Sequence, residues 1–355
     1  MADTRVKKEN HALRTVTAIL MFFIAGAHYY SRAKIGDVRV NDVIFDVGRF
    51  AIPVLVLTSG YFCYSADGHV ENDIVRKMKH ILYLIVIYKL FYLVFSTTLV
   101  IAGKTDFEYV LMEFLIVSPS LEFGAYDGSV SLETTQPIWF VYALLLIYLF
   151  WWILWKKGIS FKVAVVISVP LVLISLIVGE FMPMFDIDYV GDTNISDMAG
   201  MMYPFITLPF FTMGYYMHKH MDWLDRNVSN IMIWAVMAFG AVLTFIEAYL
   251  VGTSSIIYVS SIIVAATIFL GTFRVPEDKG RIAPLIFIGR NLTMWMYVFF
   301  GAACLIMRWV MESHTDSYWL SEVAGPILTV ILDMLMALAF HYLLKYISRQ
   351  AALRH

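Results

Sequence analysis

Charged residues and cysteines are both scarce in this chain. Only 15% of the 355 residues are charged, and the two cysteines are Cys63 and Cys304. Neither cysteine belongs to a CxxC motif or to a cysteine–histidine cluster, so a disulfide framework, a metal centre and a cysteine nucleophile all lack support. The formal net charge of −2 argues against a strongly basic nucleic-acid-binding protein.

Apolar residues are abundant instead. They make up 60% of the chain, and the mean hydropathy is +0.72, whereas soluble domains are about half apolar and about a quarter charged. A single soluble core cannot bury this much apolar surface, so lipid must solvate much of it. The sequence therefore predicts one all-α integral membrane domain over residues 1–355. Runs that can cross a bilayer lie near residues 15–30, 48–65, 80–103, 137–155, 161–181, 203–218, 230–251, 255–273, 284–311 and 322–346.

The lysines and arginines predict the orientation of these spans. Nineteen of the 26 basic residues lie in the connectors of one side, six lie on the other side, and Lys89 lies within a span. Cytoplasmic connectors carry the excess of Lys and Arg in membrane proteins. We therefore predict about ten transmembrane helices with both termini in the cytoplasm, as in a multi-pass protein of the inner (cytoplasmic) membrane.

The connector at residues 104–136 is the longest of the predicted outer loops, and it is acidic. Within it, the apolar stretch 107–117 is too short to span the bilayer. We interpret this stretch as an interfacial or re-entrant helix that covers the outer mouth. A solvated acidic surface is the alternative.

Two ionisable residues share one face of the first predicted helix. Arg14 begins that helix and His28 ends it. Fourteen residues at about 100° each stop about 40° short of four full turns, and they separate the two positions by roughly 21 Å along the axis. This pattern suits a long anionic ligand that enters at Arg14 and places its reactive end near His28, since imidazole is the usual general base near neutral pH. A positive-inside anchor and an interfacial histidine are the simpler interpretations of each residue alone.

Two further ionisable residues lie near span ends. Arg49 opens the second span on the outer side, where it either snorkels to the interface or polarises a substrate oxygen. Glu247 lies toward the outer end of its span, and we interpret it as interfacial.

Several motifs, taken in order, resemble the membrane-bound acyltransferase family 3. The first is Leu13-Arg14 at the start of helix 1, with His28 at its end. The others cover nearly the whole chain: RFAIPVLVLTSGYF (residues 49–62), RKMK (76–79), PIWFVYALLLIYL (137–149), LPFFTMGYYMHK (208–219) and IGRNLTMWMYVFF (288–300).

The resemblance implies acyl transfer across the membrane. The donor would be cytoplasmic acyl-CoA, usually acetyl-CoA, as a substrate rather than a permanently bound cofactor. The acceptor would be a hydroxyl of a cell-envelope or exported carbohydrate. The family's arginine and histidine correspond to Arg14 and His28, which would be catalytic. Its basic pair corresponds to Arg76 and Lys79, which together with Arg14 would hold the CoA phosphates.

The same motifs contain the candidate substrate-binding residues, which are Arg49, Ser59, Tyr61 and Trp139. His28 would either deprotonate the acceptor hydroxyl or carry the acyl group covalently, and the sequence leaves both mechanisms open. Thirteen residues separate Arg14 from His28, where the family more commonly has ten. Both spacings return to nearly the same helix face.

Two other classes of function remain alternatives. Some relatives of this family are the membrane halves of serine racemases, so a transporter of a small polar solute such as serine is the first. Spans interrupted at Pro53 and Pro209 also suit transport. A structural or sensory membrane partner is the second. The oligomeric state stays open, with a homodimer as one option.

Overall fold

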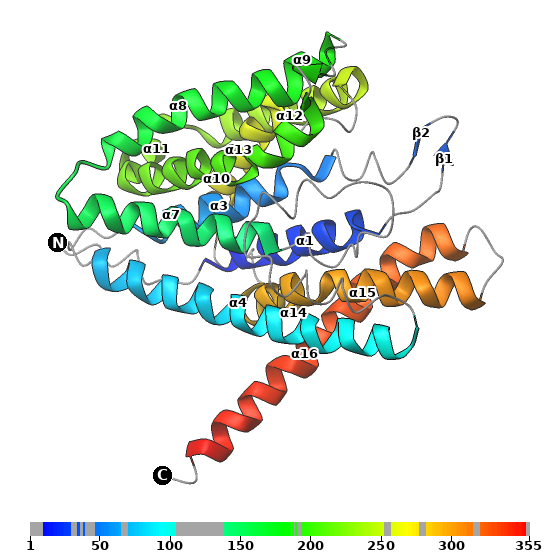
Figure 1. Cartoon of the computed structure of the whole chain (residues 1–355). Coiled ribbons are helices and arrows are strands. Elements are labelled where there is room, and N and C mark those ends of the chain that lie inside the picture. The colour runs from blue at the N-terminus through cyan, green and yellow to red at the C-terminus, as the bar shows by residue number, and fades with distance from the viewer. Residues whose placement is uncertain are drawn as a thin grey trace. The chain divides into compact units, whose positions relative to one another are not determined.

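The computed structural model describes residues 10–29, 34–35, 38–39, 47–64, 70–103, 138–185, 187, 189–190, 193–251, 257–276, 282–314 and 320–352, which are almost entirely helical (Figure 1). The predicted loop at 104–136 lies outside these residues. In chain order the elements are α1 (His11–Ala27), β1 (Lys34–Ile35), β2 (Val38–Arg39), α3 (Ala51–Tyr61), α4 (Val70–Ile101), α7 (Ile138–Lys156), α8 (Lys162–Leu176), η2 (Ile177–Phe181), α9 (Met182–Met184), β3 (Tyr189–Val190), β4 (Thr193–Asn194), α10 (Ile195–Lys219), α11 (Met221–Asn227), α12 (Asn230–Val251), α13 (Val259–Arg274), α14 (Ala283–Asn291), α15 (Thr293–His314), η4 (Leu320–Ala324) and α16 (Gly325–Ala352).

Helices occupy each of the ten predicted ranges, which confirms an all-α membrane protein. Among the described residues, five helices are long and apolar enough to cross a bilayer, and four shorter apolar helices accompany them. The five are Asp73–Ile101, Lys162–Phe181, Asn230–Val251, Thr293–Met311 and Gly325–Gln350. The count of ten spans and their orientation stay predictions.

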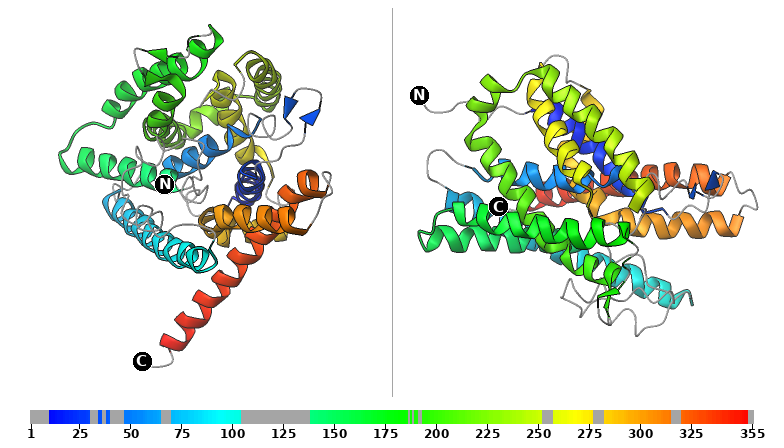
Figure 2. Two further views of the ribbon diagram at one scale, coloured as in Figure 1. Left: turned by 45° about the vertical axis from the view of Figure 1, so that its right-hand side comes forward. Right: turned by 90° about the horizontal axis from the view of Figure 1, so that it is seen from above.

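The chain divides into two compact units, which are described separately. The central unit comprises Ile52–Leu270, and the terminal unit comprises Thr4–Ala51 together with Gly271–His355. In the central unit α4 and α7 run side by side, and α10 packs on α7 and α8 (Figures 1 and 2).

Glycines set the closest helix contact of the central unit, between α3 and α10. A Cβ added to Gly60 would overlap the carbonyl oxygen of Phe211, and one added to Gly214 would overlap the carbonyl oxygen of Leu57. Small residues of this kind let helix backbones approach closely in membranes. Gly60 and Gly214 therefore explain the Ser-Gly-Tyr and Met-Gly-Tyr motifs as packing features.

The terminal unit is built around α1, which packs against α14, α15 and α16. Its buried face carries Leu13, Ala18, Met21 and Ala25. Gly289 of α14 lies against the backbone carbonyl of Arg14, where a Cβ would overlap the oxygen. The later part of α16 extends away from the other helices of this unit (Figure 1).

The ninth predicted span, residues 284–311, is two helices rather than one. α14 ends at Asn291 and α15 begins at Thr293. The Thr293 hydroxyl donates to the carbonyls of Ile288 and Gly289, at 3.3 and 3.2 Å, and the Asn291 amide donates to Phe287 at 3.0 Å. Side chains that bond to the preceding turn bend or interrupt a helix. Hydropathy is continuous across this point and gives no sign of the break.

Candidate functional site

The imidazole of His28 is held in one orientation at the end of α1. His28 is the C-cap residue of that helix, and its Nδ1 lies 2.7 Å from the Ile24 carbonyl oxygen. Because a carbonyl only accepts, Nδ1 carries the hydrogen, and in the neutral ring the lone pair lies on Nε2. The ring centroid is 4.8 Å from that of Phe300 on α15. The ring is therefore fixed from two sides, with Nε2 as its basic atom.

Arg14 and His28 occupy one helix, as predicted. The helix is capped at its start by Asn10, whose side chain accepts from Leu13 N at 2.9 Å. α1 then runs without interruption to Ala27. The side chain of Arg14 is half-buried, and it is the backbone of Arg14 that meets Gly289. The helical spacing that places both residues on one face is thus present in the structure.

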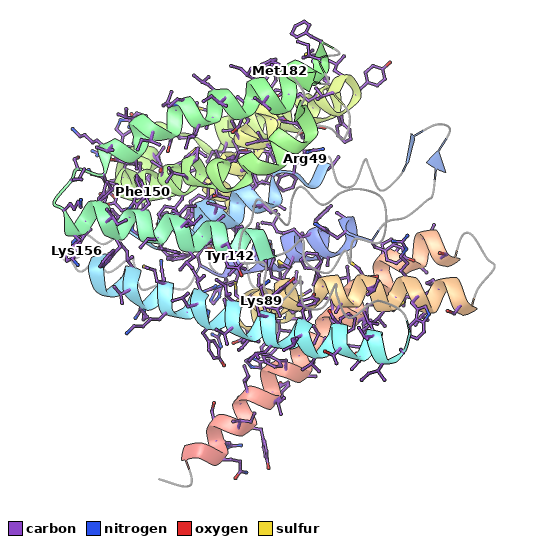
Figure 3. The ribbon with its side chains drawn as sticks, in the orientation of Figure 1. Arg49, Lys89, Tyr142, Phe150, Lys156 and Met182 are labelled. Carbon is purple, nitrogen blue, oxygen red and sulfur yellow. The ribbon has the colours of Figure 1, made fainter. Side chains whose placement is uncertain are left out.

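Arg49 lies two residues before the start of α3 (Figure 3) and is half-buried. It belongs to the terminal unit together with His28. The connection between them runs partly through residues outside the described ranges, so a role of Arg49 near His28 stays a prediction.

The candidate donor-binding pair, Arg76 and Lys79, lies exposed near the start of α4 in the central unit. The side chain of Arg76 is 76% exposed, and its guanidinium pairs with Asp73 of the same helix at 2.8 Å. Lys77, between them, differs from both, because its Nζ is buried. Only this residue of the basic motif directs its charge into the protein.

Ser59 and Tyr61 lie on the part of α3 that contacts α7 and α10. The Ser59 hydroxyl donates to the Leu55 carbonyl at 3.1 Å, and the backbone carbonyl of Ser59 accepts from the Tyr148 hydroxyl at 3.4 Å. The Tyr61 ring stacks on His218, with centroids 4.1 Å apart and planes 12° apart. Both side chains therefore have structural contacts in the central unit. Trp139 lies in the first turn of α7, and its side chain is outside the description.

Sequence reasoning missed His218 and Lys77 as potential site residues. His218 is 7% exposed, and its Nδ1 donates to the Tyr61 carbonyl at 2.7 Å. Both residues lie within motifs that the sequence singles out, but their side-chain directions depend on helix contacts between segments far apart in the chain. A residue-type pattern carries no information about those contacts.

Glu247 is buried rather than interfacial, which corrects the interpretation from sequence. Its carboxylate is 7% exposed and accepts from Ser260 N at 3.1 and 3.3 Å, at the start of α13. Glu180 is 4% exposed and accepts from the adjacent Val259 N at 3.0 Å. The two carboxyl groups satisfy the first two amides of α13, a helix end whose dipole favours negative charge.

The family of the chain follows from its match to a family model. The model described as an acyltransferase domain matches residues 10–346. The chain belongs to acyltransferase family 3. It is a multi-pass membrane enzyme that transfers acyl groups, and the transporter interpretation has no support. Neither a curated protein nor a solved structure matches the chain significantly.

Proposed function

We propose that the protein moves an acyl group, an acetyl group in the first instance, from cytoplasmic acyl-CoA to a hydroxyl of a cell-envelope carbohydrate. The observation that carries this proposal is the bond from His28 Nδ1 to the Ile24 carbonyl. It leaves Nε2 as the basic atom of the imidazole, and a base of this kind can remove the proton of an acceptor hydroxyl in O-acyl transfer. The enzyme is proposed to lie in the cytoplasmic membrane.

In the proposed reaction, His28 Nε2 removes the proton of the acceptor hydroxyl while the oxygen attacks the thioester carbonyl. The carbon–sulfur bond then breaks, and the imidazolium returns the proton to the CoA thiolate. The products are an ester and free CoA. A covalent acyl-histidine would divide the same exchange into two steps.

Each of the two units contains candidate phosphate-binding cations. Arg14 lies on the helix of His28 and is the candidate phosphate-binding cation of the terminal unit, since arginine matches phosphate geometry well. Arg76 and Lys79 are the exposed phosphate-binding candidates of the central unit. Arg49 is proposed to bind the acceptor.

The direct test follows label transfer from acetyl-CoA to envelope carbohydrate in membranes that contain either the wild type or His28→Ala. We expect His28→Ala to lower the rate by about 10²- to 10⁴-fold, with acetyl-CoA binding to the purified variant unchanged by calorimetry. His220→Ala removes an exposed histidine and is the matched control. A folded His28→Ala protein that transfers acetyl at the normal rate would refute the assignment.

The two mechanisms are separated by quenching the purified enzyme after exposure to labelled acetyl-CoA without acceptor. Label bound to the wild-type protein and absent from His28→Ala indicates the covalent route. Its absence from both, in an enzyme that transfers acetyl normally, indicates direct attack.

A further inference from the structure

Lys77 is a buried cation that lacks a hydrogen-bonding partner among the described residues. Its neighbours Arg76 and Lys79 are exposed, but Lys77 Nζ is buried and donates no hydrogen bond to any described group. The nearest described carboxylate on its helix, Asp73, is already paired with Arg76 at 2.8 Å. Asp73 attracts the ammonium group electrostatically, but a buried charge without hydrogen bonds is still costly, so it calls for an explanation.

Aromatic and sulfur groups surround this cation in place of acceptors. Lys77 Nζ lies 5.5 Å from the centroid of the Tyr148 ring. The Tyr148 hydroxyl donates to the Ser59 carbonyl, and Lys77 Nζ makes no hydrogen bond to it. The buried thiol of Cys63 is within electrostatic reach of both. Cation–π attraction to Tyr148 is small beside the desolvation cost of an ammonium group.

Flat aromatic rings adjoin the same region, at the ends of α3 and α10. His218 stacks on Tyr61, and its centroid lies 4.9 Å from that of Tyr64. Tyr64 in turn meets the ring of Tyr215 at 5.3 Å. Cys63, which lies near Lys77, directly precedes Tyr64 in the chain, so the cation and this aromatic group adjoin the same end of α3. The predicted orientation puts the ends of α3 and α10 and the start of α4 on the cytoplasmic side.

We propose that Lys77 binds a phosphoryl group of the acyl donor, with the aromatic group of Tyr61, Tyr64 and His218 beside the bound nucleotide. This inference rests on the proposed acyl-CoA donor and adds a residue to it. A phosphate supplies the acceptor oxygens that Lys77 lacks among the described residues, and lysine binds phosphate as a point charge. Exposed Arg76 and Lys79 would attract the anion, and Lys77 would hold it.

The test compares Lys77→Met with Lys156→Met. Lys156 is exposed and also lies over an aromatic ring, that of Trp152 at 4.7 Å, so it is a matched lysine–aromatic pair outside the proposed site. Calorimetry measures binding of CoA, and of pantetheine, which has no phosphoryl group. Thermal unfolding in detergent measures stability without ligand.

We expect Lys77→Met to weaken CoA binding by about 10- to 100-fold, as for loss of a charge-assisted hydrogen bond. Pantetheine binding should be unchanged, and the melting temperature without ligand should be unchanged or higher, because a buried charge without hydrogen bonds to the described residues is removed. Lys156→Met should behave as the wild type in both measurements.

Two results would overturn the inference while leaving the acyltransferase proposal intact. One is wild-type affinity of Lys77→Met for CoA. The other is a lower melting temperature of Lys77→Met with equal losses for CoA and pantetheine, which identifies a structural lysine. A third result would overturn both proposals: the wild type does not bind CoA, and phosphatidylglycerol raises the melting temperature of the wild type but not that of Lys77→Met. Lys77 would then bind a lipid headgroup, and acyl-CoA would not be the donor.

Discussion

Gly60 on α3 and Gly214 on α10 each face the backbone of the opposite helix, so that a methyl group at either position would overlap a carbonyl oxygen. The two helices therefore touch through their main chains. One turn beyond Gly214, His218 reaches the Tyr61 carbonyl and stacks on its ring. The aromatic contact depends on the glycine contact, because a wider helix separation would move His218 away from Tyr61.

We expect Gly214→Ala to destabilise the protein by about 1–3 kcal/mol or more, because a backbone contact cannot absorb the added methyl group. Gly48→Ala is the control, since nothing lies within 4 Å of a Cβ at that position. Thermal unfolding of the purified variants in detergent measures both. Equal melting temperatures for the two variants would show that α3 and α10 are not in contact as described.

The contact of Phe300 with His28 should matter for rate rather than for donor affinity. Phe300→Leu removes one of the two groups that fix the imidazole, so we expect a lower kcat with little change in the KM for acetyl-CoA. Phe299→Leu is the matched control, because Phe299 packs against Phe340 instead, at 5.3 Å. Steady-state rates of acetyl transfer are measured for both variants and the wild type. If both variants lose the same activity, Phe300 has no specific role in positioning His28.

Removing the carboxylate of Glu247 should loosen the start of α13. Glu247→Leu leaves the buried N–H of Ser260 without its acceptor, and an unsatisfied buried donor costs about 1–3 kcal/mol. Glu247→Gln keeps an acceptor oxygen, so its loss of stability should be smaller. Chemical unfolding measures the free energy of unfolding of both variants. A leucine variant as stable as the glutamine variant would contradict the hydrogen bonds of this helix end.

Arg76→Ala should weaken binding of the acyl donor without affecting folding. The ion pair of Arg76 with Asp73 is exposed and lies within one helix, and such pairs contribute little to stability. We expect an unchanged melting temperature but weaker CoA binding with a shallower salt dependence. Calorimetry at low and high salt measures this. An unchanged affinity at both salt concentrations would remove Arg76 from the donor site.

The helices were largely predictable from sequence because every apolar run of membrane length coincides with helical structure. Arg14 and His28 share a helix for the same reason, since their spacing is a local property of α1. The break near Leu292 was not predictable, because it depends on the side-chain bonds of Asn291 and Thr293 rather than on hydropathy.

Side-chain direction was the least predictable property. The run Arg-Lys-Met-Lys shows a basic cluster but does not show that Lys77 alone turns inward, since that depends on α7 and on the end of α3. Glu247 looked interfacial because its partner, the Ser260 amide at the start of α13, follows it by thirteen residues and is not visible in the local sequence. Tertiary packing decided both cases.

The contact between Gly289 and Arg14 has a consequence for how position 14 can vary. Because α14 meets the main chain of Arg14, this helix contact is the same for any non-proline side chain at position 14. Position 289 has no such latitude, since any side chain there would overlap the Arg14 carbonyl oxygen. A saturation library at position 289 would therefore retain glycine alone among well-folded variants, whereas a library at position 14 would leave the α1–α14 contact intact.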